Sequence, residues 1–218
     1  MKKSYKLILL LTLILYGCLE KDNETVLIPP YTESVPESLI PSSTIETLRA
    51  YMTINEGENP PVIEGGFLAS PMSMVYASDG YANNNFYNAR LLFSSQGCRN
   101  TICYTEEQSS AQLTCDNAIV IGQGNRFTFA GRAEMRNASA GWSCVLGLII
   151  SGECSSDGSI KQLEYANVML EKVDPYNVLL EVGDFRVYRD QDGTTLPHNW
   201  QPSAPADPVT SNIMKQNQ

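Results

Sequence analysis

The segment Asn125-Arg-Phe-Thr-Phe-Ala-Gly-Arg-Ala-Glu-Met-Arg136 decides the fold class. Successive side chains of a β-strand point to opposite faces, so a strand with one buried face alternates apolar and polar residues. This segment alternates in that way, with Phe127, Phe129, Ala133 and Met135 on one face and Thr128, Arg132, Glu134 and Arg136 on the other. The pattern predicts an antiparallel strand that covers a core.

Strand-like segments continue on both sides of this one. The stretch 142–151 carries apolar side chains on both faces, and the Asp157-Gly158 step predicts a hairpin turn into a second two-sided strand at 162–173. Many short strands separated by turns indicate an all-β domain, either a single antiparallel barrel or a β-sandwich. We prefer the barrel, although periodicity does not separate the two. Further strands are expected at 63–70, 72–77, 86–94, 101–106, 110–115, 117–122 and 183–190.

Most of the 12 prolines lie in 19–61 and 197–208, outside this run of strands. Proline lacks the amide donor that a sheet needs, so these segments flank the folded unit. Between them, Ser43 and Glu46 have capping-box spacing and predict one short helix near 43–53. We therefore expect a signal peptide at 1–17, a tether with this helix at 18–61, a β-domain at 62–193 and a flexible tail at 194–218.

The N-terminus has the features of a lipoprotein signal. Lys2, Lys3 and Lys6 precede an apolar run at 7–16, which is shorter than the roughly 20 residues that span a bilayer. The run ends in Leu15-Tyr-Gly-Cys18, which resembles a bacterial lipobox, so we expect lipidation of Cys18. Several acyl chains hold a protein firmly on a membrane. The predicted location is the bacterial outer membrane, on its surface or its periplasmic side.

Composition excludes several functions. The chain has 15 Lys+Arg against 24 Asp+Glu and a formal net charge of −9, which disfavours nucleic acid as a partner. The single histidine, His198, falls in the predicted tail, and no spacing singles out a pair of carboxylates, so we predict that the protein is not an enzyme. Asp190 and Asp192 form only a fragment of a calcium loop. No cofactor and no metal site is expected.

Five cysteines remain if Cys18 carries lipid, and an exported chain meets an oxidising environment. Cys98 and Cys103 are the nearest pair and flank a short loop, so we predict a disulfide between them. Pairing of the others stays open: Cys115, Cys144 and Cys154.

Aromatic residues are the candidates for ligand contact. Phe127, Phe129, Trp142 and Tyr165 fall on or near apolar faces, where core packing is the alternative role. Tyr81 and Tyr87 belong to an Asn- and Tyr-rich loop, and loops on a rigid scaffold often carry binding residues.

Several blocks resemble a group of uncharacterised lipoproteins of Bacteroidota. They are Tyr51-Met-Thr-Ile-Asn-Glu-Gly57, Pro60-Pro-Val-Ile-Glu-Gly-Gly-Phe67, Ser70-Pro71, 119–129, 149–153 and 182–193. The block at 60–67 also looks like the start of a lipocalin-like barrel. No activity is established for this group, so the resemblance implies architecture and location.

Two functions follow as hypotheses. The first is a lipid-anchored envelope protein whose β-domain binds a small molecule, a glycan or a protein partner. The second is a structural or assembly subunit of a cell-surface complex, in which the core is solid.

Overall fold

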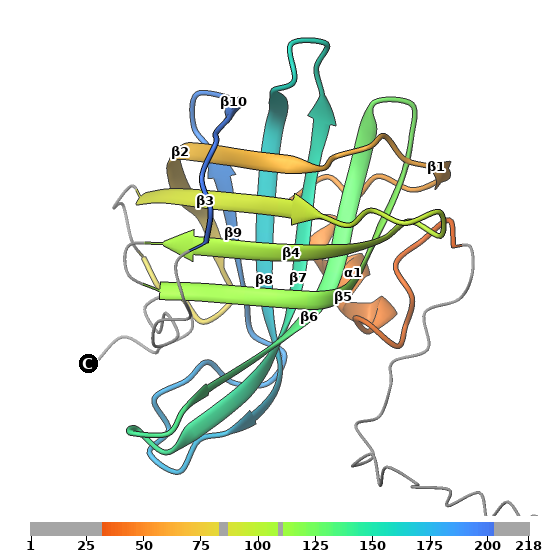
Figure 1. Cartoon of the computed structure of the whole chain (residues 1–218). Helices are drawn as coiled ribbons and strands as arrows, with labels where there is room; N and C mark the ends of the chain where they lie inside the picture. Colours follow the sequence, from red (N-terminus) through yellow and green to blue (C-terminus); the bar gives the residue numbers. More distant parts are fainter. Residues whose placement is uncertain (1–31, 83–86, 109–110, 203–218) are drawn as a thin grey trace, which may run out of the picture.

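The computed structural model describes residues 32–82, 87–108 and 111–202 (Figure 1). The chain is mostly β with one short helix, which confirms the predicted all-β class. The elements are α1 (Ser42–Leu48), β1 (Glu58–Asn59), β2 (Gly65–Ala77), β3 (Tyr87–Ser94), β4 (Thr101–Gln108), β5 (Ala111–Gln123), β6 (Arg126–Asn137), β7 (Trp142–Cys154), β8 (Ile160–Val173), β9 (Phe185–Asp190) and β10 (Thr194–Pro197). Cys18 and its predicted lipidation lie outside the described residues.

The strands pair in a closed circuit. Each strand from β2 to β9 pairs antiparallel with the next in the chain, and β9 pairs antiparallel with β2. The Asp157-Gly158 turn joins β7 to β8, with Gly158 at φ 81°, as the sequence predicts. We call the space that this circuit encloses the interior.

Two strands are longer than the sequence suggests. The predicted segments 63–70 and 72–77 form one strand, β2, whose pairing with β3 shifts register between Ala69 and Met72. A proline can stay in a strand at such an irregularity, because its missing amide is then not needed. The predicted segments 110–115 and 117–122 likewise form one strand, β5.

Several strands bury both faces, as predicted for β7 and β8. One face contributes to a cluster in the interior that includes Phe127, Phe129, Leu148 and Ile150. The other face contributes Ile119, Ala130, Ile149, Ala166 and Val187 to a second cluster on the outside of the circuit. This outer cluster exists because the N-terminal segment covers it.

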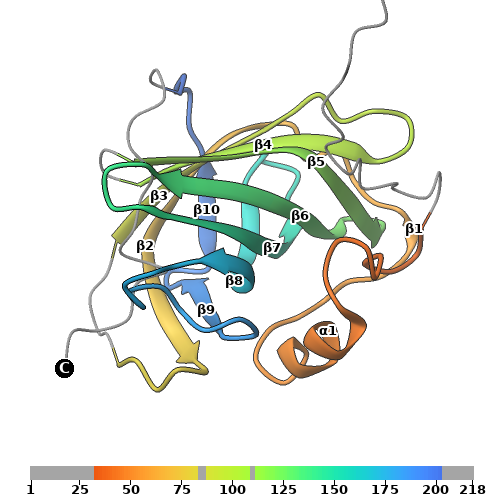
Figure 2. The same ribbon diagram turned by 90° about the horizontal axis from the view of Figure 1, so that it is seen from below.

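The segment before β2 packs on the outside of the strands. Figure 2 shows α1 lying outside the circuit, and its buried residues Ile45 and Leu48 belong to the outer cluster. Strand β1 adds a short parallel pairing, with Glu58 opposite Gly122 of β5. Residues from Val35 to Ile63 are thus part of the folded unit, which begins earlier than the predicted start at residue 62.

The predicted capping box is wrong. Pro41 is the N-cap residue of α1, and no side chain caps the helix. The carboxylate of Glu37 instead accepts hydrogen bonds from the backbone N–H of Ser42, at 2.7 Å, and from its hydroxyl. The helix starts one residue before Ser43, so Ser43 lies inside it and cannot cap it.

The C-terminal boundary lies beyond the predicted residue 193. Strand β10 pairs with both β8 and β2, where Thr195 lies opposite Ile160 and Leu196 opposite Leu68. Trp200 is 9% exposed and packs against Gly66, where an added Cβ would meet the His198 carbonyl oxygen at 2.4 Å. The absence of a side chain at Gly66 lets the C-terminal segment lie against β2.

Candidate functional site

Polar side chains gather in one part of the interior, and we call this group the polar cluster. Strands β3, β4, β8 and β9 supply its members from their inward faces. They are Tyr87, Tyr104, Glu106, Gln108, Tyr165, Asn167, Arg186 and Tyr188.

Glu106 is the buried carboxylate of the polar cluster. It is 5% exposed, and the hydroxyl of Tyr104 donates to its Oε2 at 3.0 Å. The amide of Gln108 donates to Oε1, and the hydroxyl of Tyr165 donates to the same carboxylate. A further hydrogen bond joins Gln108 to the hydroxyl of Tyr87. Three strand residues therefore donate to one acidic group, and a fourth, Tyr87, bonds to one of the three.

Burial dominates the electrostatics here. Loss of water raises the pKa of Glu106, although the hydrogen bonds from Gln108, Tyr104 and Tyr165 oppose the shift. Burial also raises the pKa of Tyr104 and Tyr165, and the charge of Glu106 adds to both shifts. The phenols therefore stay protonated and donate hydrogen bonds at neutral pH.

Arg186 is the buried cation of the polar cluster and is 1% exposed. Its Nη2 lies 2.7 Å from Oδ2 of Asp79, and its guanidinium lies 4.3 Å from the ring centroid of Tyr81. It also hydrogen-bonds the hydroxyl of Tyr188. Burial raises the pKa of Tyr188 to about 12, against the opposing effect of the Arg186 charge.

Asn167 leaves one acceptor of the polar cluster unused. Its side chain hydrogen-bonds the hydroxyl of Tyr188. Its Oδ1 is buried and has no hydrogen-bond partner among the described residues. Buried polar atoms are nearly always paired, since leaving one unpaired costs about 1–3 kcal/mol. The polar cluster therefore offers one acceptor that a donor group on a ligand could occupy.

The polar cluster meets an aromatic region at Tyr104. The ring of Tyr104 lies 5.1 Å from that of Phe93 and 5.0 Å from that of Phe129, while its hydroxyl reaches Glu106. Phe93 in turn contacts Phe67, with ring centroids 6.1 Å apart. The rings of Phe67, Phe93 and Phe129 thus form one packed group beyond Tyr104.

The predicted ligand-contact residues divide between these two regions. Tyr87 and Tyr165 belong to the polar cluster, and Tyr81 lies over its arginine. Phe127, Phe129 and Trp142 instead belong to the apolar part of the interior.

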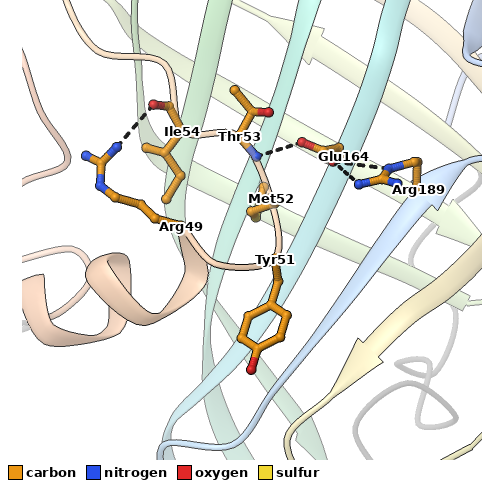
Figure 3. A pocket seen from close by; sticks show the side chains of 7 residues that line it. All are labelled: Arg49, Tyr51, Met52, Thr53, Ile54, Glu164 and Arg189. Carbon is orange, nitrogen blue, oxygen red and sulfur yellow. Dashed lines mark hydrogen bonds and ion pairs between the residues drawn. The ribbon is translucent and has the colours of Figure 1, made fainter.

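A second polar site lies on the outside, in a crevice of about 420 Å³ between the N-terminal segment and the strands (Figure 3). Glu164 on β8 accepts from the backbone N–H of Thr53 at 2.7 Å and lies 2.5 Å from Nη2 of Arg189. Arg49 donates to the carbonyl oxygen of Ile54 at 3.4 Å and pairs with Glu56. Each of these charged groups bonds to another part of the same chain. Glu164 thereby joins the N-terminal segment, through Thr53, to β8 and to Arg189 of β9.

No protein family, curated protein or solved structure matches the chain. The likeness to Bacteroidota lipoproteins therefore stays an expectation from the sequence. Function has to be argued from the polar cluster itself.

The predicted disulfide between Cys98 and Cys103 is wrong, since both thiols are free. Cys103 lies within the β3–β4 ladder opposite Ser94, and its thiol donates to the carbonyl oxygen of Asp116 at 3.6 Å. Cys98 lies in the turn beyond the end of that ladder, where Gly97 N–H donates to Thr101. Nearness in sequence does not bring the two side chains together.

The other cysteines lie further along the sheet. The thiol of Cys115 is 3.0 Å from the carbonyl oxygen of Arg132. Burial raises the pKa of Cys144 to about 11, so it is not a thiolate at neutral pH.

The candidate metal and catalytic residues occupy structural positions. Asp192 accepts from the backbone N–H of Thr194 at 2.8 Å, and Asp190 accepts from the hydroxyl of Thr195 at 2.6 Å. Within the described ranges, no group of three or more His, Cys, Asp or Glu side chains could hold a metal ion. His198 N–H donates to Gly66 at 2.8 Å, and its Nδ1 has no partner in this part of the chain.

The described residues contain no helix that is long and apolar enough to cross a membrane.

Sequence reasoning missed Glu106, Gln108, Asn167 and Arg186 as site residues. Strand β4 did carry a signal, because Ile102, Tyr104, Glu106 and Gln108 share one face in Thr101–Gln108, and that face is buried. A carboxylate that continues an apolar face is a candidate for a buried functional group. Asn167 and Arg186 gave no comparable signal.

Proposed function

We propose that this chain is a lipid-anchored protein of the bacterial outer membrane whose β-domain binds a small molecule or glycan in its interior, without catalysis. The lipobox at Cys18 supports the anchor. The polar cluster supports the binding site.

The domain is, in this proposal, a lipocalin-like up-and-down barrel rather than a sandwich. The closed circuit from β2 to β9 and back to β2 supports the barrel, because a sandwich consists of two separate sheets. Small barrels of this kind either fill their interior with side chains or hold one ligand. The rings of the aromatic region pack against one another, and the polar cluster contains the unused acceptor of Asn167.

The unpaired Oδ1 of Asn167 is the observation that carries the binding proposal. A core that served only stability would gain by replacing a buried carboxylate, arginine and unpaired amide with apolar side chains. A ligand with a hydroxyl or amine group would pair with Asn167, and the nearby phenol rings of Tyr165 and Tyr188 provide apolar faces for its carbon atoms.

A thermal-shift experiment on the full chain tests the binding site. The probes are maltose, N-acetylglucosamine and palmitate, at concentrations up to the solubility of each. A probe present at 100-fold excess over its Kd should raise the Tm by about 5 to 10 °C. Asn167→Leu should lose this shift, while Asn199→Leu, the same change at an exposed position, should keep it.

Two results would contradict the proposal. If no probe shifts the Tm, the alternative gains support: a structural or assembly subunit with a solid core, which the packed aromatic region favours. If a probe shifts the Tm of Asn167→Leu as much as that of the natural chain, the ligand binds elsewhere.

The anchor is tested separately. Cys18→Ser should move the chain from the membrane fraction to the soluble fraction and abolish incorporation of labelled palmitate. A variant that stays in the membrane fraction would contradict anchoring through Cys18.

A further inference from the structure

Among the described residues, no strand pairs with one edge of β6 over its second half. Its ladder with β5 ends where Ala118 lies opposite Gly131, while its ladder with β7 continues until Asn137 lies opposite Trp142. Figure 1 shows β6 running away from β5 beyond this point. The thiol of Cys115 on β5 reaches the Arg132 carbonyl oxygen, one residue beyond the end of that ladder.

The free backbone groups belong to Glu134 and Arg136. In an antiparallel strand the N–H and C=O of one residue point to the same side, and this side alternates along the chain. The Asn125 carbonyl oxygen accepts from Cys154 at the end of β7, whereas that of Arg132 points toward β5. The odd-numbered residues of β6 therefore bond to β7, and Glu134 and Arg136 face the edge.

The side chains at this edge carry opposite charges and are exposed. Arg132 already pairs with Glu171. Among the described residues, neither Glu134 nor Arg136 forms an ion pair within the chain.

We propose that this edge pairs antiparallel with the same edge of a second copy of the chain. A two-fold pairing centred on Met135 places Glu134 opposite Arg136 of the second copy, and Arg136 opposite Glu134. Both residues face the edge, so each opposite pair can exchange two backbone hydrogen bonds. The contact is self-complementary, as a two-fold interface requires.

The charges at this edge favour this register over the two registers whose centre is shifted by one residue. Centring the pairing on Glu134 sets two glutamates opposite each other, and centring it on Arg136 does the same for two arginines. Like charges directly opposite are unfavourable in a sheet, whereas opposite charges are favourable. Charged side chains also protect a sheet edge from pairing, and this is the competing role for Glu134 and Arg136.

Charge reversal distinguishes pairing with a second copy from protection of the edge. The result of this experiment does not depend on the proposed ligand. The dimer Kd of the full chain is measured in detergent by analytical ultracentrifugation. Glu134→Arg and Arg136→Glu should each raise that Kd about tenfold or more, because each sets like charges opposite at two places. The double variant restores both pairs, so its Kd should return to within about threefold of the natural value.

Glu58→Arg is the matched control, since it makes the same change of charge at an exposed residue of β1 and should leave the Kd unchanged. Far-UV circular dichroism checks that each variant is folded. A natural chain that stays monomeric overturns the proposal and supports edge protection. Single variants that dimerise like the natural chain, or a double variant that stays monomeric, overturn it as well.

Discussion

The two regions of the interior use aromatic rings in different ways. Beyond Tyr104, the rings of Phe67, Phe93 and Phe129 pack against one another and carry no polar atom. On the near side, the rings of Tyr165 and Tyr188 lie 5.9 Å apart, and each carries a hydroxyl bonded to a charged residue. The same circuit of strands thus encloses a region built for stability and a region that gives up stability for polar chemistry.

This difference is the basis of the proposed binding site. Apolar packing would have sufficed to close the interior, as it does around Phe129. Burying Glu106, Arg186 and the unpaired Oδ1 of Asn167 costs free energy, and the proposed binding site would account for that cost. Four predictions test the contrast between the regions.

The largest effect is expected in the aromatic region. Phe129 is 0% exposed and contacts both Phe93 and Tyr104, so Phe129→Ala should lower the free energy of unfolding by about 3–5 kcal/mol. Urea denaturation followed by circular dichroism measures this change. A loss below about 1 kcal/mol would show that the region is not tightly packed.

The second largest effect on stability is expected from breaking the ion pair between Arg186 and Asp79. Arg186→Met keeps much of the side-chain volume but leaves Asp79, whose side chain is 14% exposed, without its cation. The expected loss is about 3 kcal/mol, at the low end for buried pairs because Asp79 retains some water. Arg126→Met is the control, since Arg126 is 68% exposed and its ion pair should contribute less than about 1 kcal/mol. Equal losses in the same urea assay would contradict the special position of Arg186.

The pH dependence of stability tests Glu106. Because its pKa is raised above the ordinary value of 4.5, the native chain keeps a proton that the unfolded chain has lost. The free energy of unfolding should therefore fall as pH rises from about 4.5 to the native pKa, by about 1.4 kcal/mol for each unit between the two pKa values. Glu106→Gln should flatten this fall in urea titrations at a series of pH values. An unchanged slope would mean that other groups cause it.

The smallest effect on stability is expected at Tyr165. Tyr165→Phe removes one hydrogen bond to Glu106 and should cost about 1 kcal/mol. The same variant should weaken binding of any probe that shifts the Tm of the natural chain, as measured by calorimetry. Phe129→Leu, which alters only apolar packing, should leave that affinity nearly unchanged. Equal loss of affinity in both variants would contradict the division of roles.

Local patterns predicted the strands well. The alternation in 125–136 placed the inward residues of β6 correctly, and the apolar side chains on both faces of β7 and β8 are buried. The sequence predicted a break within β2 and another within β5, and neither exists. Pro71 and the polar pair at 116–117 interrupt the apolar pattern, but the strands continue through them.

Long-range features were not predictable in this way. The contact between Glu164 and Thr53 joins residues far apart in sequence, and the spacing of apolar residues in the two segments does not predict it. The start of the helix was missed for a related reason: Glu37, outside the expected motif, accepts from the backbone N–H of Ser42, and Ser43 lies inside the helix. The polar cluster likewise depends on register between four strands, which places Glu106 beside Tyr165.

Native mass spectrometry of the chain, purified from the cells that make it, tests directly whether the polar cluster holds a ligand. We expect a small molecule that adds mass under native conditions and is lost on denaturation, while any covalent lipid remains. Asn167→Leu should carry none of this added mass, and Asn199→Leu should carry it in full. A natural chain with the same mass under both conditions would contradict a ligand in the polar cluster.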